Sequence, residues 1–173
     1  MITVDFKLIE QVRSGNEEAF TRLLEHYTPY VYRTAFAFLH DEHESEDVAQ
    51  EIFLKVYRSI RELQDIAAFN AWLKRIITNS CLDRLRRQRP IPVHDIELNQ
   101  NQIIENTSQK WDQHLEIQEA INRLIPEYRE VLILREWQGY DYQEIATLLS
   151  IPLGTVKSRI HGARLQLRKI LSE

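Results

Sequence analysis

The stretch that decides the fold reads Tyr142-Gln-Glu-Ile-Ala-Thr-Leu-Leu-Ser-Ile-Pro-Leu-Gly-Thr-Val-Lys-Ser-Arg-Ile-His-Gly-Ala-Arg164. Apolar residues recur at helical spacing on both sides of Pro152. The stretch therefore predicts a helix over 142–149, a short turn, and a second helix over 153–171. The small side chain of Ala146 stands where the second helix must pass closely. This pattern is typical of a helix-turn-helix, whose second helix enters the major groove of DNA.

The second helix has two unlike faces. One face is apolar and is predicted to be core: Val156, Ile160, Ala163, Leu167 and Leu171. The other face carries basic side chains and hydroxyl groups that can donate hydrogen bonds to guanine edges and phosphates. The residues predicted to face duplex DNA are Thr155, Lys157, Ser158, Arg159, His161, Arg164 and Arg168. An ordinary amphipathic helix is the alternative, but the turn, the small residue and the acid-free outer face together favour DNA binding.

The charge is distributed in blocks that the formal net charge of −4 conceals. Residues 151–172 hold five bases and no acid, and residues 74–89 hold six bases and one acid. Residues 41–51 hold six acids and neither Lys nor Arg. Two basic patches and one acidic patch predict a polyanion partner and a separate protein partner. Solvated helix faces are the alternative that charge alone leaves open.

The composition and periodicity predict an all-α fold. The 173 residues are 43% hydrophobic with only 4 Gly and 5 Pro, and strand signals are scarce. Helices are expected at 4–14, 17–39, 43–62, 68–88, 112–123, 127–137, 142–149 and 153–171. Gly15 is expected to end the first helix, and Asp41 with Glu44 and Asp141 with Glu144 have capping-box spacing. The aperiodic stretch 90–111 predicts a flexible linker between two helical domains, 1–89 and 112–173.

Several classes of protein are disfavoured. The chain has no apolar run that could cross a membrane, and its first residues do not form a signal peptide, so we expect it in the cytoplasm. A single cysteine, Cys81, excludes an internal disulfide and a cysteine-rich zinc site. A metal site at His40 and His43 is an alternative, but these residues straddle a helix cap and lack a tight ligand set. With no glycine-rich phosphate loop, we expect neither an enzyme nor a cofactor or metal.

The predicted helix 68–88 carries a basic face. Arg75, Asn79 and Arg86 share an exposed side with Lys74 and Thr78. Basic side chains can contact phosphates, an amide can hydrogen-bond an extruded nucleobase, and aromatic rings can stack on that nucleobase. This face therefore suits single-stranded or opened DNA. The predicted DNA contacts are Phe69, Trp72, Lys74, Arg75, Asn79, Arg84, Arg86 and Arg87. Core packing of the two aromatic residues is the favoured alternative to direct stacking.

The predicted helix 43–62 carries a different surface. Ala49, Ile52, Phe53, Val56 and Ile60 lie on its apolar side. The opposite stripe consists of Asp47, Gln50, Glu51, Leu54 and Arg58. Acids and an amide around an exposed leucine are typical of a face that docks on another helix. A merely solvated surface is the alternative.

Taken in order, these segments resemble the bacterial extracytoplasmic-function sigma factors, small members of the sigma-70 family. Asp47-Val-Ala-Gln-Glu51-Ile-Phe is similar to region 2.2, and Phe69-Asn-Ala-Trp-Leu73 through Asn79, with Asp83-Arg-Leu-Arg-Arg87, is similar to regions 2.3 and 2.4. Leu124–Leu134 is similar to region 4.1, and Tyr142–Arg164 is similar to region 4.2. The match covers most of the chain outside the linker. No single motif is decisive, but the ordered set is specific.

The resemblance implies a sigma factor that binds core RNA polymerase and directs promoter-specific initiation. Asp47, Gln50 and Glu51 would dock on the β′ clamp helices, and the C-terminal domain would have the β flap as a partner. Asn79 would hold a flipped base of the −10 element, and the second helix of the helix-turn-helix would read the −35 duplex. An anti-sigma factor is a further implied partner. His161 stands at a position where many members of the family have an aromatic residue. This difference concerns which promoter sequence is recognised.

A stand-alone helix-turn-helix transcriptional regulator is the alternative function. It accounts equally well for residues 112–173. It leaves the basic face at 74–89 and the docking face at 47–58 without a role, so the sequence favours the sigma factor.

Overall fold

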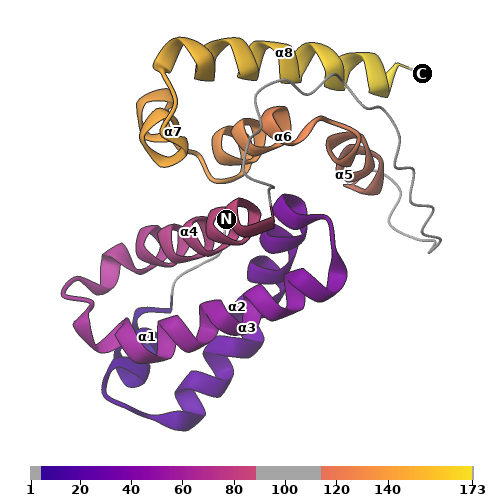
Figure 1. The fold of residues 1–173 in the computed structure, drawn as a ribbon. Coiled ribbons are helices and arrows are strands. Elements are labelled where there is room, and N and C mark those ends of the chain that lie inside the picture. Colours follow the sequence, from indigo (N-terminus) through magenta and orange to yellow (C-terminus); the bar gives the residue numbers. More distant parts are fainter. Residues whose placement is uncertain (1–4, 89–113, 173) are drawn as a thin grey trace.

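The computed structural model describes residues 5–88 and 114–172, and within those ranges it contains helices and no strand. The elements are α1 (Phe6–Arg13), α2 (Glu17–Leu39), α3 (Glu42–Ser59), η1 (Ile60–Glu62), η2 (Ile66–Ala68), α4 (Phe69–Gln88), α5 (His114–Asn122), α6 (Pro126–Leu132), the π-helical turn η3 (Ile133–Trp137), α7 (Tyr142–Leu149) and α8 (Leu153–Leu171) (Figure 1). The predicted all-α class is confirmed. The predicted linker, 90–111, lies outside the described residues.

Local capping chemistry sets several helix ends. Beyond α1, Gly15 has a φ of 91°, its N–H donates to the carbonyl of Val12 at 2.9 Å, and the N–H of Asn16 donates to Gln11 at 3.1 Å. This pair of bonds is a Schellman motif, which confirms Gly15 as the end of the helix. At α7 the predicted capping box is complete, with Asp141 and Glu144 each accepting from the other's backbone N–H.

The second predicted capping box is only half formed. At the start of α3, the carboxylate of Asp41 accepts from the backbone N–H of Glu44 at 2.9 Å. The reciprocal bond is replaced because the Glu44 carboxylate turns to Arg84 of α4, 3.1 Å away. A tertiary ion pair has therefore taken the side chain that the local motif would have used.

The N-terminal half packs α1 through α4 around one core. α2 contacts α1, α3 and α4, and α3 contacts α4. The fully buried side chains recur every three or four residues along each helix, as a core-facing stripe requires. They include Leu23, Tyr27 and Val31 of α2, Val48, Ile52 and Val56 of α3, and Leu73 and Ile77 of α4. Pro29 lies inside α2 without ending it.

The C-terminal half is built around α8. α5, α6 and α7 all contact this helix, and Ile121, Leu124, Leu132 and Ala163 form a small core of their own. The approach of α6 is close, because a Cβ placed on Gly162 would stand 2.6 Å from the hydroxyl oxygen of Tyr128. α7 ends at Ser150, which has a φ of 55°, and Pro152 precedes α8. The predicted helix-turn-helix boundaries, 142–149 and 153–171, match the structure.

The prediction that Leu171 of α8 belongs to the core is wrong. Leu171 is 52% exposed, whereas Ile170 packs against the small core of Ile121, Leu124, Leu132 and Ala163. Ile170 stands three residues after Leu167, which also packs there, so the apolar stripe continues at a spacing of three rather than four.

The two halves pack against each other. Figure 1 shows α4 between the α2–α3 pair and the α6–α7 region, with α8 on the outer side of the C-terminal half. Val131, Leu134, Tyr140 and Ile145 belong to the same hydrophobic cluster as the buried residues of α2, α3 and α4. The predicted domains therefore share a continuous core in this structure.

Candidate nucleic-acid and protein interfaces

The predicted docking stripe on α3 lies at the surface. Asp47, Gln50, Glu51, Leu54 and Arg58 are all exposed. Leu54 is 55% exposed and the neighbouring Tyr57 is 49% exposed, so two large apolar side chains adjoin each other on this face. The structure brings all five predicted residues onto one face of one helix.

A groove of about 700 Å³ lies beside this stripe, between α2 and α3. Its α2 wall consists of Phe20, Leu24, Thr28 and Tyr32, and its α3 wall includes Ala49, Gln50, Phe53, Leu54 and Tyr57. The α2 wall was missed by the sequence interpretation. The signal was present, because its four residues recur at a spacing of four and so form a stripe along the helix, separate from the buried stripe.

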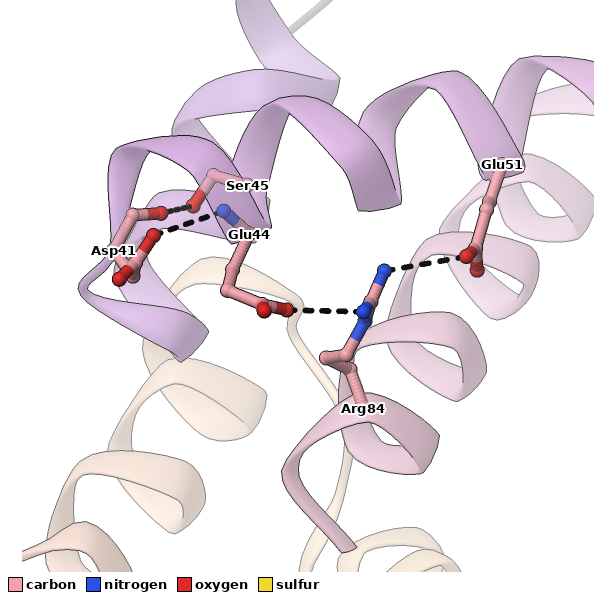
Figure 2. Close-up of polar contacts among 5 residues, drawn as sticks. All are labelled: Asp41, Glu44, Ser45, Glu51 and Arg84. Atoms are coloured by element: carbon pink, nitrogen blue, oxygen red, sulfur yellow. Dashed lines mark hydrogen bonds and ion pairs between the residues drawn. The ribbon is translucent and has the colours of Figure 1, made fainter. Parts of the chain in front are cut away.

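Arg84 was predicted to contact DNA, but it is turned toward α3. Figure 2 shows its guanidinium between two carboxylates, 3.1 Å from Glu44 and 3.2 Å from Glu51. The arginine therefore ties α4 to the acidic face of α3. A contact of Arg84 with DNA would therefore compete with these two ion pairs.

The basic face of α4 is only partly open. Arg75, Asn79, Arg86 and Arg87 are exposed, and Arg75 and Asn79 stand one helical turn apart. Lys74 is half-buried, with its ammonium nitrogen 4.0 Å from the centre of the Tyr140 ring. The guanidinium of Arg86 donates to the backbone carbonyl of Leu148 at 2.8 Å and pairs with Asp83 at 3.3 Å.

Phe69 follows the core-packing alternative that the sequence favoured over a direct DNA contact, whereas the exposed position predicted for Thr78 is wrong. Phe69 is fully buried against Tyr27, with ring centres 5.4 Å apart, so it supports the core and does not present its ring to DNA. The ring of Trp72 lies 5.8 Å from that of Phe69 and stays half-buried, which leaves it as the aromatic side chain near the basic face. Thr78, predicted to be exposed, is buried and accepts a hydrogen bond from the Tyr140 hydroxyl at 3.4 Å.

The predicted DNA-facing side of α8 is open. Lys157, Ser158, His161, Arg164 and Arg168 are exposed, and Thr155 and Arg159 are half-buried. The guanidinium of Arg164 lies 2.6 Å from the Glu136 carboxylate, and this hydrogen bond raises the pKa of Arg164. The cations therefore stand on a surface that a duplex can approach, with one of them paired in the free protein.

Metal ligands do not gather in the part of the chain that the structure describes. Within residues 5–88 and 114–172, no three side chains among His, Cys, Asp and Glu are grouped to hold a metal ion. Burial raises the pKa of the Cys81 thiol to about 12, so the thiol is protonated and unreactive at neutral pH. None of the described helices is both long enough and apolar enough to cross a membrane.

Comparison with known families matches two family models to two separate parts of the chain. The model of sigma-70 region 2 matches residues 23–91, and the model of sigma-70 region 4 matches residues 114–167. The chain belongs to the extracytoplasmic-function sigma factors of the sigma-70 family. Sigma factors bind core RNA polymerase and promoter DNA, and by family they are initiation factors rather than enzymes.

Several relatives of this sigma factor match it nearly end to end. It is 34% identical to the extracytoplasmic-function sigma factor SigW of Bacillus subtilis strain 168, over 96% of each chain. It is 31% identical to the sigma-E factor of Escherichia coli K12, over 92% of this chain and 90% of that one. The structure of CnrH in complex with the cytosolic domain of CnrY superposes with a TM-score of 0.59 at 26% identity, covering 97% of both chains.

Proposed function

We propose that this sigma factor uses three separate helical surfaces in initiation: α3 docks on core RNA polymerase, α4 opens and reads the −10 element, and α8 reads the −35 duplex. The observation that carries the proposal is the complementarity of these surfaces. The face of α3 combines acids with exposed apolar groups, whereas α4 and α8 present cations. α3 and α4 lie within the match to region 2, and α8 lies within the match to region 4 as far as residue 167. Protein and polyanion partners are thus assigned to different helices.

The α3 surface fits a helical partner that carries basic and apolar side chains. Asp47, Gln50, Glu51 and Arg58 supply the polar rim, while Leu54 and the adjoining groove supply the apolar contact. Such a combination of apolar centre and polar rim is the usual anatomy of a protein interface. We propose the β′ clamp helices as the partner of this surface and the β flap as the partner of the C-terminal half.

The α4 surface fits an opened −10 element. The Asn79 amide offers both a donor and an acceptor to an extruded base. Arg75 and Arg87 are exposed on the same helix and supply positive charge for phosphates, with Lys74 and Arg86 available once their contacts with the C-terminal half are released. Trp72 is the aromatic group that can meet an unstacked base, and Phe69 holds it in place from the core.

The α8 surface fits the major groove of the −35 duplex. Lys157, Ser158, His161, Arg164 and Arg168 project from the exposed side of the helix, and Thr155 and Arg159 flank them. Arginine and lysine pair with guanine edges and phosphates, each good bidentate pair contributing about 1–3 kcal/mol of discrimination between bases. On binding, Arg164 would break its ion pair with the Glu136 carboxylate and contact the DNA instead.

The domain division and the setting complete the proposal. Residues 1–89 and 112–173 would act as separate promoter-binding domains, with 90–111 spanning between them on polymerase. An anti-sigma factor is proposed as a regulatory partner, supported by the similar CnrH, which is seen in complex with the cytosolic domain of CnrY. The sigma factor would act in the cytoplasm, where its polymerase is, and an anti-sigma factor could hold it at the membrane.

Run-off transcription with purified core RNA polymerase tests the proposal. Transcript 5′ ends are sequenced across a genomic template with and without the protein. Discrete starts that require the protein and share an upstream two-part sequence are the expected result. A protein that yields no starts, does not bind core, and binds duplex DNA alone with high affinity would instead be a stand-alone regulator.

A further inference from the structure

Arg84 is placed differently from the neighbouring arginines of α4. Its side chain is 21% exposed, whereas Arg86 and Arg87 stand at the surface. Its guanidinium lies beside α3, where one nitrogen is 3.1 Å from the Glu44 carboxylate and the other is 3.2 Å from that of Glu51 (Figure 2). Arg84 is therefore directed at the helix that we assign to core RNA polymerase.

The bridge depends on the shape of the guanidinium group. Glu44 and Glu51 are separated by about two turns of α3, so their carboxylates lie on the same side of the helix at separate points. Nη1 of Arg84 meets the first carboxylate and Nη2 meets the second. A lysine ammonium is a compact point charge without this planar fork. The two carboxylates therefore require an arginine here, whereas a phosphate would accept either cation.

A second polar contact fixes the alignment of α3 with α4. The ammonium group of Lys55 on α3 donates to the hydroxyl of Ser80 on α4 at 2.8 Å, and Ser80 is buried. Lys55 stands one turn after Glu51, and Ser80 stands one turn before Arg84. The two helices thus run antiparallel at this seam. The contact between Lys55 and Ser80 helps to hold Arg84 opposite Glu51.

Glu51 belongs both to this bridge and to the docking stripe. Its side chain is 48% exposed, and it stands about one turn from Asp47 on one side and from Leu54 on the other. Its Oε1 atom accepts the hydrogen bond from Arg84, so its Oε2 atom can accept one from a partner. A side chain that is already held in one orientation loses less conformational entropy on binding. The bridge therefore prepares Glu51 for docking.

We propose that Arg84 is a positioning residue for core binding, which holds the Glu51 carboxylate in the orientation that a basic side chain of the polymerase meets. This role rests on the proposed docking of α3 on core RNA polymerase. Arg84 thus serves the protein interface, whereas Arg87, one turn further along α4, keeps the proposed contact with phosphates.

Binding kinetics of the full chain on immobilised core RNA polymerase test this role. Arg84→Gln should speed dissociation by about threefold to tenfold, as expected when one ordered side chain is released. Its association rate should be equal to that of the wild type or higher, because the docking face becomes more acidic. The matched control is Arg22→Gln, which removes an exposed arginine of α2 that contacts Gln11, and it should leave both rates unchanged.

Arg84→Lys gives a second, milder variant. It keeps the positive charge, but one ammonium group cannot bridge two carboxylates as the guanidinium does. Arg84→Lys should therefore still dissociate from core faster than the wild type. Circular dichroism verifies the folding of each variant, and this one decides the question if Arg84→Gln fails to fold.

A double-mutant cycle shows whether Arg84 acts through Glu51. Glu51→Gln alone should weaken core binding, because it removes the charge that meets the partner. Addition of Arg84→Gln to that variant should change the dissociation rate by less than about twofold. An equal loss in both backgrounds would mean that the two residues act independently, as expected of an arginine that supports the fold alone.

Salt dependence separates this role from a DNA contact. The complex of sigma factor and core is bound to a promoter fragment found in the run-off assay, with core at saturation. The slope of log affinity against log salt concentration then reports the number of phosphates that are neutralised. Arg87→Gln should reduce this slope by about 0.7–0.9, whereas Arg84→Gln should leave it unchanged.

The outcomes separate the role of Arg84 from the proposed function. If Glu51→Gln weakens core binding but Arg84→Gln and Arg84→Lys dissociate like the wild type, α3 docks on core without help from Arg84. A smaller salt slope for Arg84→Gln would make Arg84 a DNA contact and would also overturn the role. If Glu51→Gln binds core as tightly as the wild type, the proposed docking stripe is wrong, and the role of Arg84 is lost with it. The measurements on core need no promoter.

Discussion

α4 and α8 are both basic helices assigned to promoter DNA, yet their cations differ in how far they are paired within the free protein. On α4, Lys74, Arg84 and Arg86 are each engaged by other parts of the chain. On α8, Arg164 is paired with Glu136, and the neighbouring Lys157, His161 and Arg168 are exposed. The difference shows that three cations of α4 are shared with partners elsewhere in the chain, whereas most of the cations on the proposed DNA face of α8 stand open to solvent.

The largest expected effect comes from Asn79→Ala on α4. Loss of the amide removes the proposed hydrogen bonds to a flipped base, worth about 1–3 kcal/mol per base contact. Promoter-specific transcription with core polymerase should fall at least tenfold, while core binding stays unchanged. The matched control is Gln88→Ala at the exposed end of the same helix. Equal activity of the two variants would contradict the assignment of α4 to the −10 element.

Arg164 provides the corresponding test on α8. Arg164→Ala should weaken binding of the polymerase complex to −35 duplex by about tenfold, within the range of one lost base or phosphate contact. Glu136→Gln should strengthen this binding by about twofold to threefold at most, because an exposed ion pair contributes little free energy. Competition binding at fixed salt measures both. If Glu136→Gln weakens binding as much as Arg164→Ala, the pair has a structural role instead.

A pair of glycines tests how α8 is held. A Cβ at Gly162 would meet the Tyr128 side chain at 2.6 Å, whereas a Cβ at Gly154 would meet nothing within 4 Å. Gly162→Ala should therefore be less stable than Gly154→Ala by about 1–3 kcal/mol, the usual cost of overpacking. Urea unfolding followed by circular dichroism measures the free energy of unfolding of both. Equal stabilities would mean that α6 does not fix the position of α8.

The smallest expected effect is a pH dependence, through His40, of the equilibrium between the packed arrangement of the two halves (the closed state) and an open one in which they separate. Burial lowers the pKa of His40, and so does the nearby charge of Arg129 in region 4, while Asp41 opposes the shift. A lowered pKa means that closure favours the neutral imidazole, so this contribution is full above the ordinary pKa of about 6.5 and is lost as the pH falls through the lowered value. Acidification from pH 7.5 to 5.5 should therefore increase the open fraction slightly.

The distance between spin labels at two exposed positions, Glu18→Cys on α2 and Leu165→Cys on α8, measures this change, while the buried Cys81 stays unlabelled. His40→Gln should remove the part of the pH dependence that comes from the imidazole. A dependence of unchanged size in that variant would assign it to other groups.

The local parts of the fold were predictable from the sequence. The ends of α7 and α8 follow from the Asp141–Glu144 box and Pro152, and the exposed stripe on α3 follows from helical periodicity. The failures share a tertiary cause. Thr78 is buried because Tyr140, far away in the sequence, covers it, and Arg84 turns to α3 because two carboxylates converge there. Periodicity along one helix carries no information on which distant segment will cover it.

Reactivity of two lysines tests the difference between α4 and α8 most directly. The free protein is acetylated with limiting N-hydroxysuccinimide acetate, and modification is followed by mass spectrometry. Lys157 on α8 should react quickly and Lys74 on α4 slowly, because the Tyr140 ring covers the latter. Tyr140→Ala should bring Lys74 close to the rate of Lys157. Equal rates for the two lysines in the wild-type protein would contradict the claim that Tyr140 covers Lys74 of α4 while Lys157 of α8 stands open to solvent.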